Sequence, residues 1–457
     1  MAPESLQDVV ESTDDLVEKF RETDISQGDV HWTVYEDERT HWIEEQRASH
    51  ETCILMDQSY HIATHYFEGP DAVALNADLG VSNFDEFPKR EAPQAKQHPI
   101  CNPKGYIIGD PILFLLGDEK VSVTGNRGLA QKWLQYNAET GDYDASVTDV
   151  YTPYGERPPV EFRFEIQGPN ARAVMGDVLD GSVPEISFFE MDVVSIHGHD
   201  VYMLGHGMAS SRGYEIFGPF ELHDEIKERI LEVGADYGIR ELGAKAYKTG
   251  TLTTGWLPLG LPAIYEHDEM EGYRRWLDAD SVEANWSLGG SFDSANIEDY
   301  YLNAVELGYE KFINFDREFV GRDALRARAA DPDRTKVTFV WDEADVVDIF
   351  ASLFRDGETY KIFEFPDIAQ KWDMGHFDEV RLGGELVGVS LFAGYDYNQR
   401  EMLSLGVVDV EHSDPGTEAT LVWGEEHSEK ARVERHVEKD IGVTIAPAPY
   451  ASEREDM

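Results

Sequence analysis

The chain has 457 residues, with 39 Lys and Arg against 90 Asp and Glu, so its formal net charge is −51. This balance argues against nucleic-acid binding, because phosphate neutralisation requires clustered Lys and Arg. Hydrophobic residues make up 41% of the chain, enough for a packed core, so the acidity does not indicate disorder. We expect a folded enzyme of a halophile, in which molar salt shortens the Debye length to ~3 Å and screens the surface charges.

The first twenty residues are acidic and amphipathic, unlike a signal peptide, and no run approaches the ~20 apolar residues of a membrane span. We therefore expect a cytoplasmic protein without a membrane partner. Cys53 and Cys101 lie far apart and lack metal-ligand spacing, which favours two buried thiols.

Hydrophobic periodicity predicts hairpins and single helices rather than repeated parallel βαβ units, which is typical of an α+β fold. Helices are predicted to begin near Leu129, Ala171 and Leu222, and the last of them to stop near Gly234 or Gly238. The predicted strands are residues 112–116, 121–124, 162–166, 193–196, 201–204 and 214–217.

Two places are interpreted as domain junctions. Residues 326–336 join a helical pattern to a strand-like VTFVW with Pro332 between them, so we place the start of a C-terminal domain near Lys336. Residues 138–159 are polar, aromatic and rich in proline, and predict an internal junction.

Two motifs carry most of the chemical information. In GHGMASSRGYEIFGP (residues 205–219), a Gly-rich turn leads into a strand that buries Ile216 on one side and points Glu215 to the other. In LGAKAYKTGTLTTGWLPLGLPAIY (residues 242–265), Tyr247 and Trp256 add a phenol and an indole.

These motifs resemble the tetrahydrofolate-dependent methyltransferase family that includes the glycine-cleavage T-protein, the sulfoniopropionate demethylases and the aryl-methyl-ether demethylases acting on vanillate and syringate. The last branch is the most similar. The resemblance extends from residues 57–72 through residues 291–325 to the terminal APAPY. It implies an α+β fold with three domains in a cloverleaf. The folate-binding region would be residues 1–335, with two interleaved subdomains, and residues 336–457 would form a β-barrel or jelly-roll-like domain.

The resemblance implies tetrahydrofolate as the cofactor and assigns three residues to it. Glu215 would accept hydrogen bonds from the 2-amino group and ring N–H of the pterin, which form a paired donor edge. Trp256 would stack on or wall the ring, and Gln167 would add a side-chain amide. For Trp256, packing in the core is the alternative role.

Methyl transfer from an ether leaves negative charge on the departing oxygen, so the site needs a proton donor beside that oxygen. The resemblance places Tyr247 in this role, with simple packing of a buried phenol as the alternative. Asp110 matches the functional aspartate of the T-protein, which orients or deprotonates the folate nitrogen. Its alternative role is to cap a turn.

On the substrate side, the resemblance points to Trp32, His61 and Arg127, with Arg127 pairing with a benzoate carboxylate. A structural role is the alternative for His61. We expect no metal ion, because His197 and His199 lie in a predicted hairpin turn without further ligands.

The sequence therefore predicts a tetrahydrofolate-dependent O-demethylase of a methoxylated aromatic acid. Lys245 and Ala246 precede Tyr247 where the T-protein carries an Arg-Asp pair, which disfavours the glycine-cleavage substrate. Two alternatives stay open. One is a demethylase of a sulfonium or methylamine compound, held by an aromatic cage. The other is a folate-binding protein that transfers no methyl group.

Overall fold

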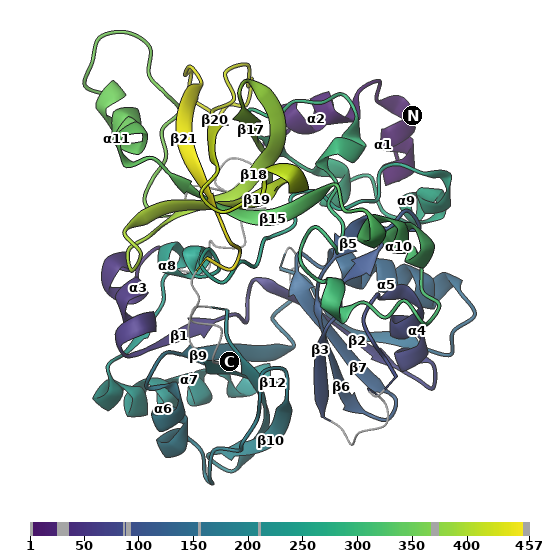
Figure 1. Ribbon diagram of the computed structural model, residues 1–457. Helices are drawn as coiled ribbons and strands as arrows, with labels where there is room; N and C mark the ends of the chain where they lie inside the picture. The colour runs from purple at the N-terminus through teal and green to yellow at the C-terminus, as the bar shows by residue number, and fades with distance from the viewer. Residues whose placement is uncertain are drawn as a thin grey trace. The chain divides into compact units, whose positions relative to one another are not determined.

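The structure is a computed structural model and describes residues 3–24, 36–85, 87, 93–153, 157–208, 212–366 and 374–450. Contacts between Cα atoms divide the chain into two compact units. The described parts of residues 1–27, 101–109 and 255–450 form the first unit, and those of residues 28–100 and 110–254 form the second (Figure 1).

The second unit contains a six-stranded sheet in which all neighbouring pairs are antiparallel except β1 with β13. Its order is β10 (Met191–Ile196), β11 (His199–His206), β12 (Gly213–Pro219), β9 (Glu161–Gln167), β1 (Cys53–Asp57) and β13 (Ile239–Glu241). One face packs on α6 (Ala171–Val178) and α7 (His223–Gly234) through buried apolar residues such as Phe164, Val174 and Ile226.

The same unit holds a five-stranded antiparallel sheet. Its order is β3 (Gln94–Gln97), β6 (Ile112–Gly117), β7 (Lys120–Asn126), β2 (Ile62–Glu68) and β8 (Ser146–Tyr151). Helices α4 (Ala72–Leu79) and α5 (Leu129–Thr140) pack against β7. Phe114 of β6 packs on Leu204 and Phe217 of the six-stranded sheet. Residues 58–61, between β1 and β2, join the two sheets.

The second face of the six-stranded sheet is covered in part by helices. Ile54 and Met56 of β1 pack there on Ala246 and Tyr247 of α8 (Ala244–Thr249), and on Ala48 of α3 (Trp42–Glu51). Both faces of this sheet are therefore buried over much of its area.

A closed six-stranded barrel dominates the C-terminal part of the first unit. Its strands are, in order, β15 (Arg334–Trp341), β19 (Glu401–Asp409), β18 (Glu385–Asp396), β17 (Asp378–Leu382), β20 (Glu418–Trp423) and β21 (Lys439–Ala446). Inward-facing apolar residues, among them Phe339, Trp341 and Trp423, fill the interior with α11 (Glu343–Ser352) packed alongside. Closure removes the exposed strand edges that a sheet otherwise presents.

A charged cluster is buried beside this barrel. The ammonium group of Lys361 pairs with Glu425 Oε1, and Lys430 Nζ lies 3.7 Å from Glu425 Oε2. Lys430 also donates to the Leu288 carbonyl, and the Trp423 indole donates to the Lys361 carbonyl (2.8 Å). The cluster ties separate segments of the first unit together.

The remaining helices and strands are short. They are α1 (Leu6–Ser12), α2 (Leu16–Glu22), α9 (Glu271–Trp276), α10 (Arg322–Ala330), β4 (Ile100–Cys101), β5 (Ile107–Gly109), β14 (Leu288–Gly289) and β16 (Gly375–His376). The 3₁₀ helices are η4 (Phe220–Leu222), η5 (Ala235–Tyr237), η6 (Asp268–Met270), η7 (Glu283–Asn285), η8 (Ile297–Tyr300), η9 (Glu310–Phe312) and η10 (Val410–His412). None of the helices in the described ranges is long and apolar enough to cross a membrane.

The strands and helices predicted from periodicity are confirmed. β6 and β7 form the expected antiparallel pair, as do β10 and β11. Helix α7 ends at Gly234 and the turn after it ends at Gly238, which has a left-handed backbone (φ 75°) that favours glycine. Residues 146–151, which read as a polar junction, form strand β8 paired with β2.

Candidate active site

One face of strand β9 is the centre of the site. Because side chains alternate along a strand, Glu161, Arg163, Glu165 and Gln167 share a face, while the apolar residues between them face α6 and α7. Every residue of β9 is buried. Strand β12 places Glu215 directly opposite Glu165. Three carboxylates therefore lie on one buried surface.

Arg163 neutralises part of this charge. Its guanidinium group forms ion pairs with Glu161 and with Glu215 Oε1. It also lies over the rings of Phe217 and Phe114, at 4.2 and 4.9 Å from their centroids. Burial opposes the charge, but the two carboxylates outweigh it and raise the pKa of Arg163 above its ordinary value. Glu215 is thus fixed at one oxygen by a permanent cation.

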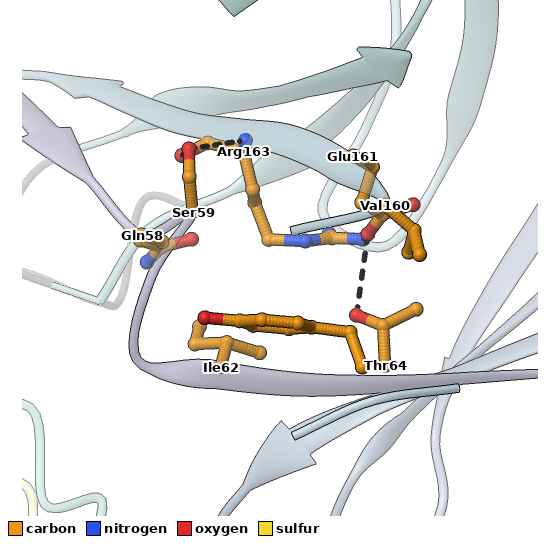
Figure 2. A pocket seen from close by; sticks show the side chains of 8 residues that line it. Gln58, Ser59, Ile62, Thr64, Val160, Glu161 and Arg163 are labelled. Carbon is orange, nitrogen blue, oxygen red and sulfur yellow. Dashed lines mark hydrogen bonds and ion pairs between the residues drawn. The ribbon is translucent and has the colours of Figure 1, made fainter. Parts of the chain in front are cut away.

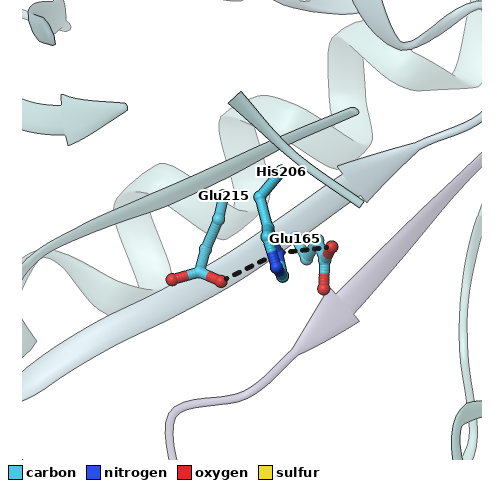
Figure 3. A group of neighbouring side chains, drawn as sticks. All are labelled: Glu165, His206 and Glu215. Atoms are coloured by element: carbon cyan, nitrogen blue, oxygen red, sulfur yellow. Dashed lines mark hydrogen bonds and ion pairs between the residues drawn. The ribbon is translucent and has the colours of Figure 1, made fainter. Parts of the chain in front are cut away.

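His206, at the end of β11, lies between Glu165 and Glu215 (Figure 3). Its Nδ1 is 3.2 Å from Glu165 Oε1 and 3.5 Å from Glu215 Oε2. These atoms lie within 4.8 Å of one another, as metal ligands would. However, Glu165 Oε1 already accepts hydrogen bonds from Gln167 Nε2 (2.7 Å) and the Met208 backbone N–H (2.8 Å). We therefore interpret the group as a surface rich in hydrogen-bond acceptors.

Tyr247 of α8 and His61 form a buried pair. The Tyr247 hydroxyl lies 2.7 Å from His61 Nε2, and their rings meet edge to face. Burial, and next the negative charge of Glu165, raise the pKa of Tyr247 well above its ordinary value. Burial lowers the pKa of His61 to about 3, against a smaller opposing effect of Asp57. At neutral pH the pair is therefore a neutral phenol bonded to a neutral imidazole.

Gln58 connects the Tyr247 pair to the polar face. Its Nε2 donates to Glu165 Oε2 (2.9 Å), and a hydrogen bond from Gln58 to Tyr247 partly offsets the rise in the phenol pKa. Gln58 also lines a pocket, with room for about one water molecule, beside Arg163 and Glu161 (Figure 2). The remaining lining residues are Ser59, Ile62, Thr64, Tyr151 and Val160.

The segment that carries Gln58 and His61 is anchored at its start. Asp57 Oδ2 accepts hydrogen bonds from His223 Nε2 (2.9 Å) and Lys227 Nζ (3.1 Å), and Oδ1 accepts from the Ser59 backbone N–H (3.1 Å). Burial alone would favour the acid form, but the His223 hydrogen bond and the Lys227 charge hold the pKa of Asp57 well below its usual range. The segment between the sheets is thus held by a charged network.

Asp110, Arg127 and His61 lie at one end of the five-stranded sheet. The register pairs Ile62 with Asn126 and Ile112 with Thr124. His61, Arg127 and Asp110 lie one or two residues beyond these positions and therefore at the same end of the sheet. Arg127 is buried, with a left-handed backbone at φ 57°. Asp110 accepts a hydrogen bond from Gln97 Nε2 at its carbonyl (2.8 Å).

Comparison with known proteins identifies the family. The model of the GCVT N-terminal domain matches residues 16–271, more than half of the chain. The chain belongs to this family. A syringate O-demethylase of Sphingobium sp. strain SYK-6 is 35% identical over 455 residues, covering 98% of this chain and 96% of the relative. A sesamin methylene transferase of Sinomonas sp. strain No.22 is 26% identical over 393 residues, covering 84% and 82%.

A solved structure shows the same fold. The glycine cleavage system aminomethyltransferase T from Bartonella henselae superposes with a TM-score of 0.61 at 16% identity, covering 96% of each chain. The resemblance seen in the sequence, the α+β fold of the T-protein type and the C-terminal barrel are confirmed.

Within this GCVT-family chain, the structure brings together four of the predicted site residues and places two more at a nearby sheet end. Glu215 and Gln167 lie around Glu165, and the charges of Glu165 and Glu215 act on Tyr247, which binds His61. Asp110 and Arg127 are placed at the sheet end that begins beside His61. Trp256 is half-buried in the other compact unit, and Trp32 lies outside the described residues, so both assignments stay predictions.

Four residues of the candidate site were not singled out from the sequence: Arg163, Glu165, His206 and Gln58. Strand β9 reads as alternating charged and apolar residues, which is typical of a strand with one solvent-facing side. The signal that could have revealed a site is the mixture of both charge signs and an amide within one short strand whose neighbours are all apolar.

Proposed function

We propose that this protein is a tetrahydrofolate-dependent O-demethylase, which transfers a methyl group from a methoxylated aromatic acid to tetrahydrofolate and releases the phenol. The observation that carries the proposal is the buried hydrogen bond between Tyr247 and His61, 2.7 Å long and next to the carboxylate face. The relative named as a syringate O-demethylase, which aligns along nearly the whole chain, supports the same substrate class.

The residues on the β9 and β12 face fit a reduced pterin. Its 2-amino group and ring N–H are donors and need a buried acceptor, which Glu215 supplies. The side-chain oxygen of Gln58 is a further buried acceptor that receives no hydrogen bond from the described residues. Tetrahydrofolate, when bound, supplies the nucleophilic nitrogen that accepts the methyl group.

Tyr247 would act at the ether oxygen. As the bond between the methyl carbon and this oxygen breaks, the electron pair stays on the oxygen, and the Tyr247 O–H stabilises the developing phenolate by donating to it. Because its pKa lies well above the ordinary value, Tyr247 keeps its proton across the working pH range. The phenol is therefore always present in its donating form.

His61 would orient that proton. When its own proton is on Nε2, His61 donates to the Tyr247 oxygen, which leaves the Tyr247 hydrogen free to point to the substrate. Burial, which lowers the pKa of His61 to about 3, keeps it neutral, so that it carries a single ring N–H.

The end of the five-stranded sheet would bind the aromatic acid. Arg127 is buried at the sheet end next to His61, and its fixed cation suits a benzoate carboxylate. Asp110 at the same end would orient or deprotonate the folate nitrogen, and Trp256 and Trp32 stay proposed contacts of the cofactor and of the substrate.

The decisive experiment offers a panel of methyl donors to the protein in molar salt with tetrahydrofolate. We expect 5-methyltetrahydrofolate and a free phenol from vanillate or syringate, measured by liquid chromatography with mass detection. Methyl transfer from dimethylsulfoniopropionate or dimethylglycine alone would contradict the aromatic substrate. Transfer from none of the four would contradict the proposed activity.

We further propose that the protein works in a cytoplasm containing molar salt. The support is the net charge of −51, whose self-repulsion such salt would screen. The midpoint of thermal unfolding should then rise steeply between 0.1 and 3 M KCl, roughly as the Debye length falls from ~10 Å to below ~3 Å. An unchanged midpoint would contradict this proposal.

A further inference from the structure

Glu165 is a side chain on which four separate donors converge. Its Oε1 accepts from Gln167 Nε2 (2.7 Å), from the Met208 backbone N–H (2.8 Å) and lies 3.2 Å from His206 Nδ1. Its Oε2 accepts from Gln58 Nε2 (2.9 Å). Glu165 has no exposed surface. Such a carboxylate leaves little capacity for a ligand, but it fixes each of its donors.

The four donors come from different parts of the site. Gln167 is the amide expected to contact the pterin, and His206 reaches across to Glu215, the expected pterin acceptor. Gln58 lies on the segment between the two sheets and forms a hydrogen bond to Tyr247. The Glu165 carboxylate is therefore the common point between the cofactor-binding and the proton-donating side chains.

We propose that Glu165 is a positioning residue that holds Gln167, His206 and Gln58 in one arrangement, so that the folate grip and the Tyr247 phenol are aligned with each other. This inference rests on the proposed function of the site. Glu165 does not itself touch the reacting atoms.

The charge of Glu165 gives this role a second signature. Among charged groups, Glu165 contributes most to the raised pKa of Tyr247. Removal of the negative charge should therefore lower the pH at which Tyr247 ionises. A residue that only fills space on the sheet would have no such effect.

The test compares Glu165→Gln and Glu165→Asp with the full-length parent protein. Glu165→Gln removes one acceptor oxygen and the charge, and should weaken tetrahydrofolate binding by about 10-fold or more, because hydrogen bonds to charged groups are lost. Glu165→Asp keeps the charge but shortens the side chain. It should weaken binding too, yet leave the ionisation of Tyr247 at the parent pH. Binding is measured calorimetrically without a methyl donor, and Tyr247 ionisation by ultraviolet difference spectra against matching Tyr247→Phe variants.

A double-mutant cycle decides whether Glu165 acts through Gln167. In the Gln167→Ala background, Glu165→Gln should cost less affinity than it does in the parent, because one of the three side chains that it positions is gone. Fully additive losses would overturn the proposal, as would parent-like binding in Glu165→Gln. If Glu165→Gln does not fold, Glu165→Asp carries the same cycle.

Glu306→Gln is the matched control. Glu306 is a buried carboxylate of the first unit that accepts from the Asn303 backbone N–H (2.9 Å) and pairs with Arg334. It should lower stability without changing folate affinity or Tyr247 ionisation. Folate binding is measured without a methyl donor, so it does not depend on methyl transfer. A parent protein that binds folate but transfers no methyl group would contradict the proposed function, and the binding measurements would still test the role of Glu165.

Discussion

The protein buries charged side chains in two regions. Cations outnumber carboxylates in one of them, and carboxylates outnumber cations in the other. Beside the barrel, Lys361 and Lys430 converge on one carboxylate, Glu425, and a backbone carbonyl takes up a further ammonium hydrogen. On the β9 and β12 face, three carboxylates lie beside one arginine, which pairs with Glu161 and Glu215, and a histidine lies between Glu165 and Glu215. The barrel cluster is completed by protein groups from distant segments, whereas the sheet face presents acceptors beside a pocket. Buried charge connects segments of the fold in the first region, and under the proposed function it serves ligand recognition in the second.

The largest expected effect comes from Tyr247→Phe, which tests the ligand side of the comparison. Loss of the hydroxyl should lower kcat for aryl-ether demethylation by about 100-fold or more, the usual contribution of a positioned proton donor. Folate affinity should change little. Tyr265→Phe is the matched control, since Tyr265 is another buried phenol, which donates to the Glu283 carbonyl (2.8 Å). Similar kcat values for parent and Tyr247→Phe would remove Tyr247 from the chemistry.

Lys361→Met tests the barrel side. The variant keeps the straight side chain but leaves Glu425 short of one cation, which should reduce the free energy of unfolding by about 3–5 kcal/mol. Urea denaturation in high salt measures this, and folate affinity of the folded variant should equal that of the parent. Lys120→Met removes a half-exposed partner of Glu68 and should cost less than about 1 kcal/mol. An equal cost for both variants would mean that the barrel cluster adds no stability.

Glu215→Gln and Glu425→Gln compare the two regions by their effect on folate affinity. Glu215→Gln removes the charged acceptor proposed for the pterin edge, so the dissociation constant for tetrahydrofolate should rise between about 10- and 100-fold. Glu425→Gln alters the barrel carboxylate instead and should change stability but not this constant. Calorimetric titration measures this constant for both variants. Loss of tetrahydrofolate affinity in Glu425→Gln, with parent-like affinity in Glu215→Gln, would contradict the comparison.

The smallest effect concerns pH. The pKa of His61 is about 3 in the folded chain, below its ordinary value of ~6.5. Because the folded value is the lower one, the stabilisation is complete above about pH 6.5 and is lost as the pH falls toward 3. By pH 5 this group alone should cost about 2 kcal/mol. His61→Gln should therefore lose less stability than the parent between pH 7 and pH 5, measured by thermal unfolding.

His197→Gln, in the exposed turn between β10 and β11, is the control for the pH series. It should follow the parent curve. A His61→Gln curve parallel to that of the parent would mean that acid loss arises elsewhere.

Much of the fold follows from local patterns. The hairpin of β6 and β7, the strand β12 and the helix α7 each carry a clear period and turn residues, and the structure has them where expected. Strand β8 carries no such pattern, because its residues are largely half-exposed and polar. Pairing with β2, rather than an apolar face, holds it in place. Pairing partners distant in sequence leave no local signal.

The site was predictable only in part, for a similar reason. Glu215, Tyr247 and Gln167 were found because their motifs resemble a family. Arg163 and Glu165 were not, because alternate charges on a strand predict contact with water. The packing of Phe114 from the other sheet, which lies over Arg163 and Phe217, and the cover of α8 and α3 bury this face. These contacts depend on tertiary structure alone.

The short connection at residues 58–61 has a consequence for protein engineering. It is the covalent passage from β1 to β2, and Asp57, Gln58 and His61 secure it at three places, to α7, β9 and α8 respectively. Under the proposed function, we expect that a new loop around Arg127 would change which aromatic ether is accepted without altering the carboxylates of β9 and β12.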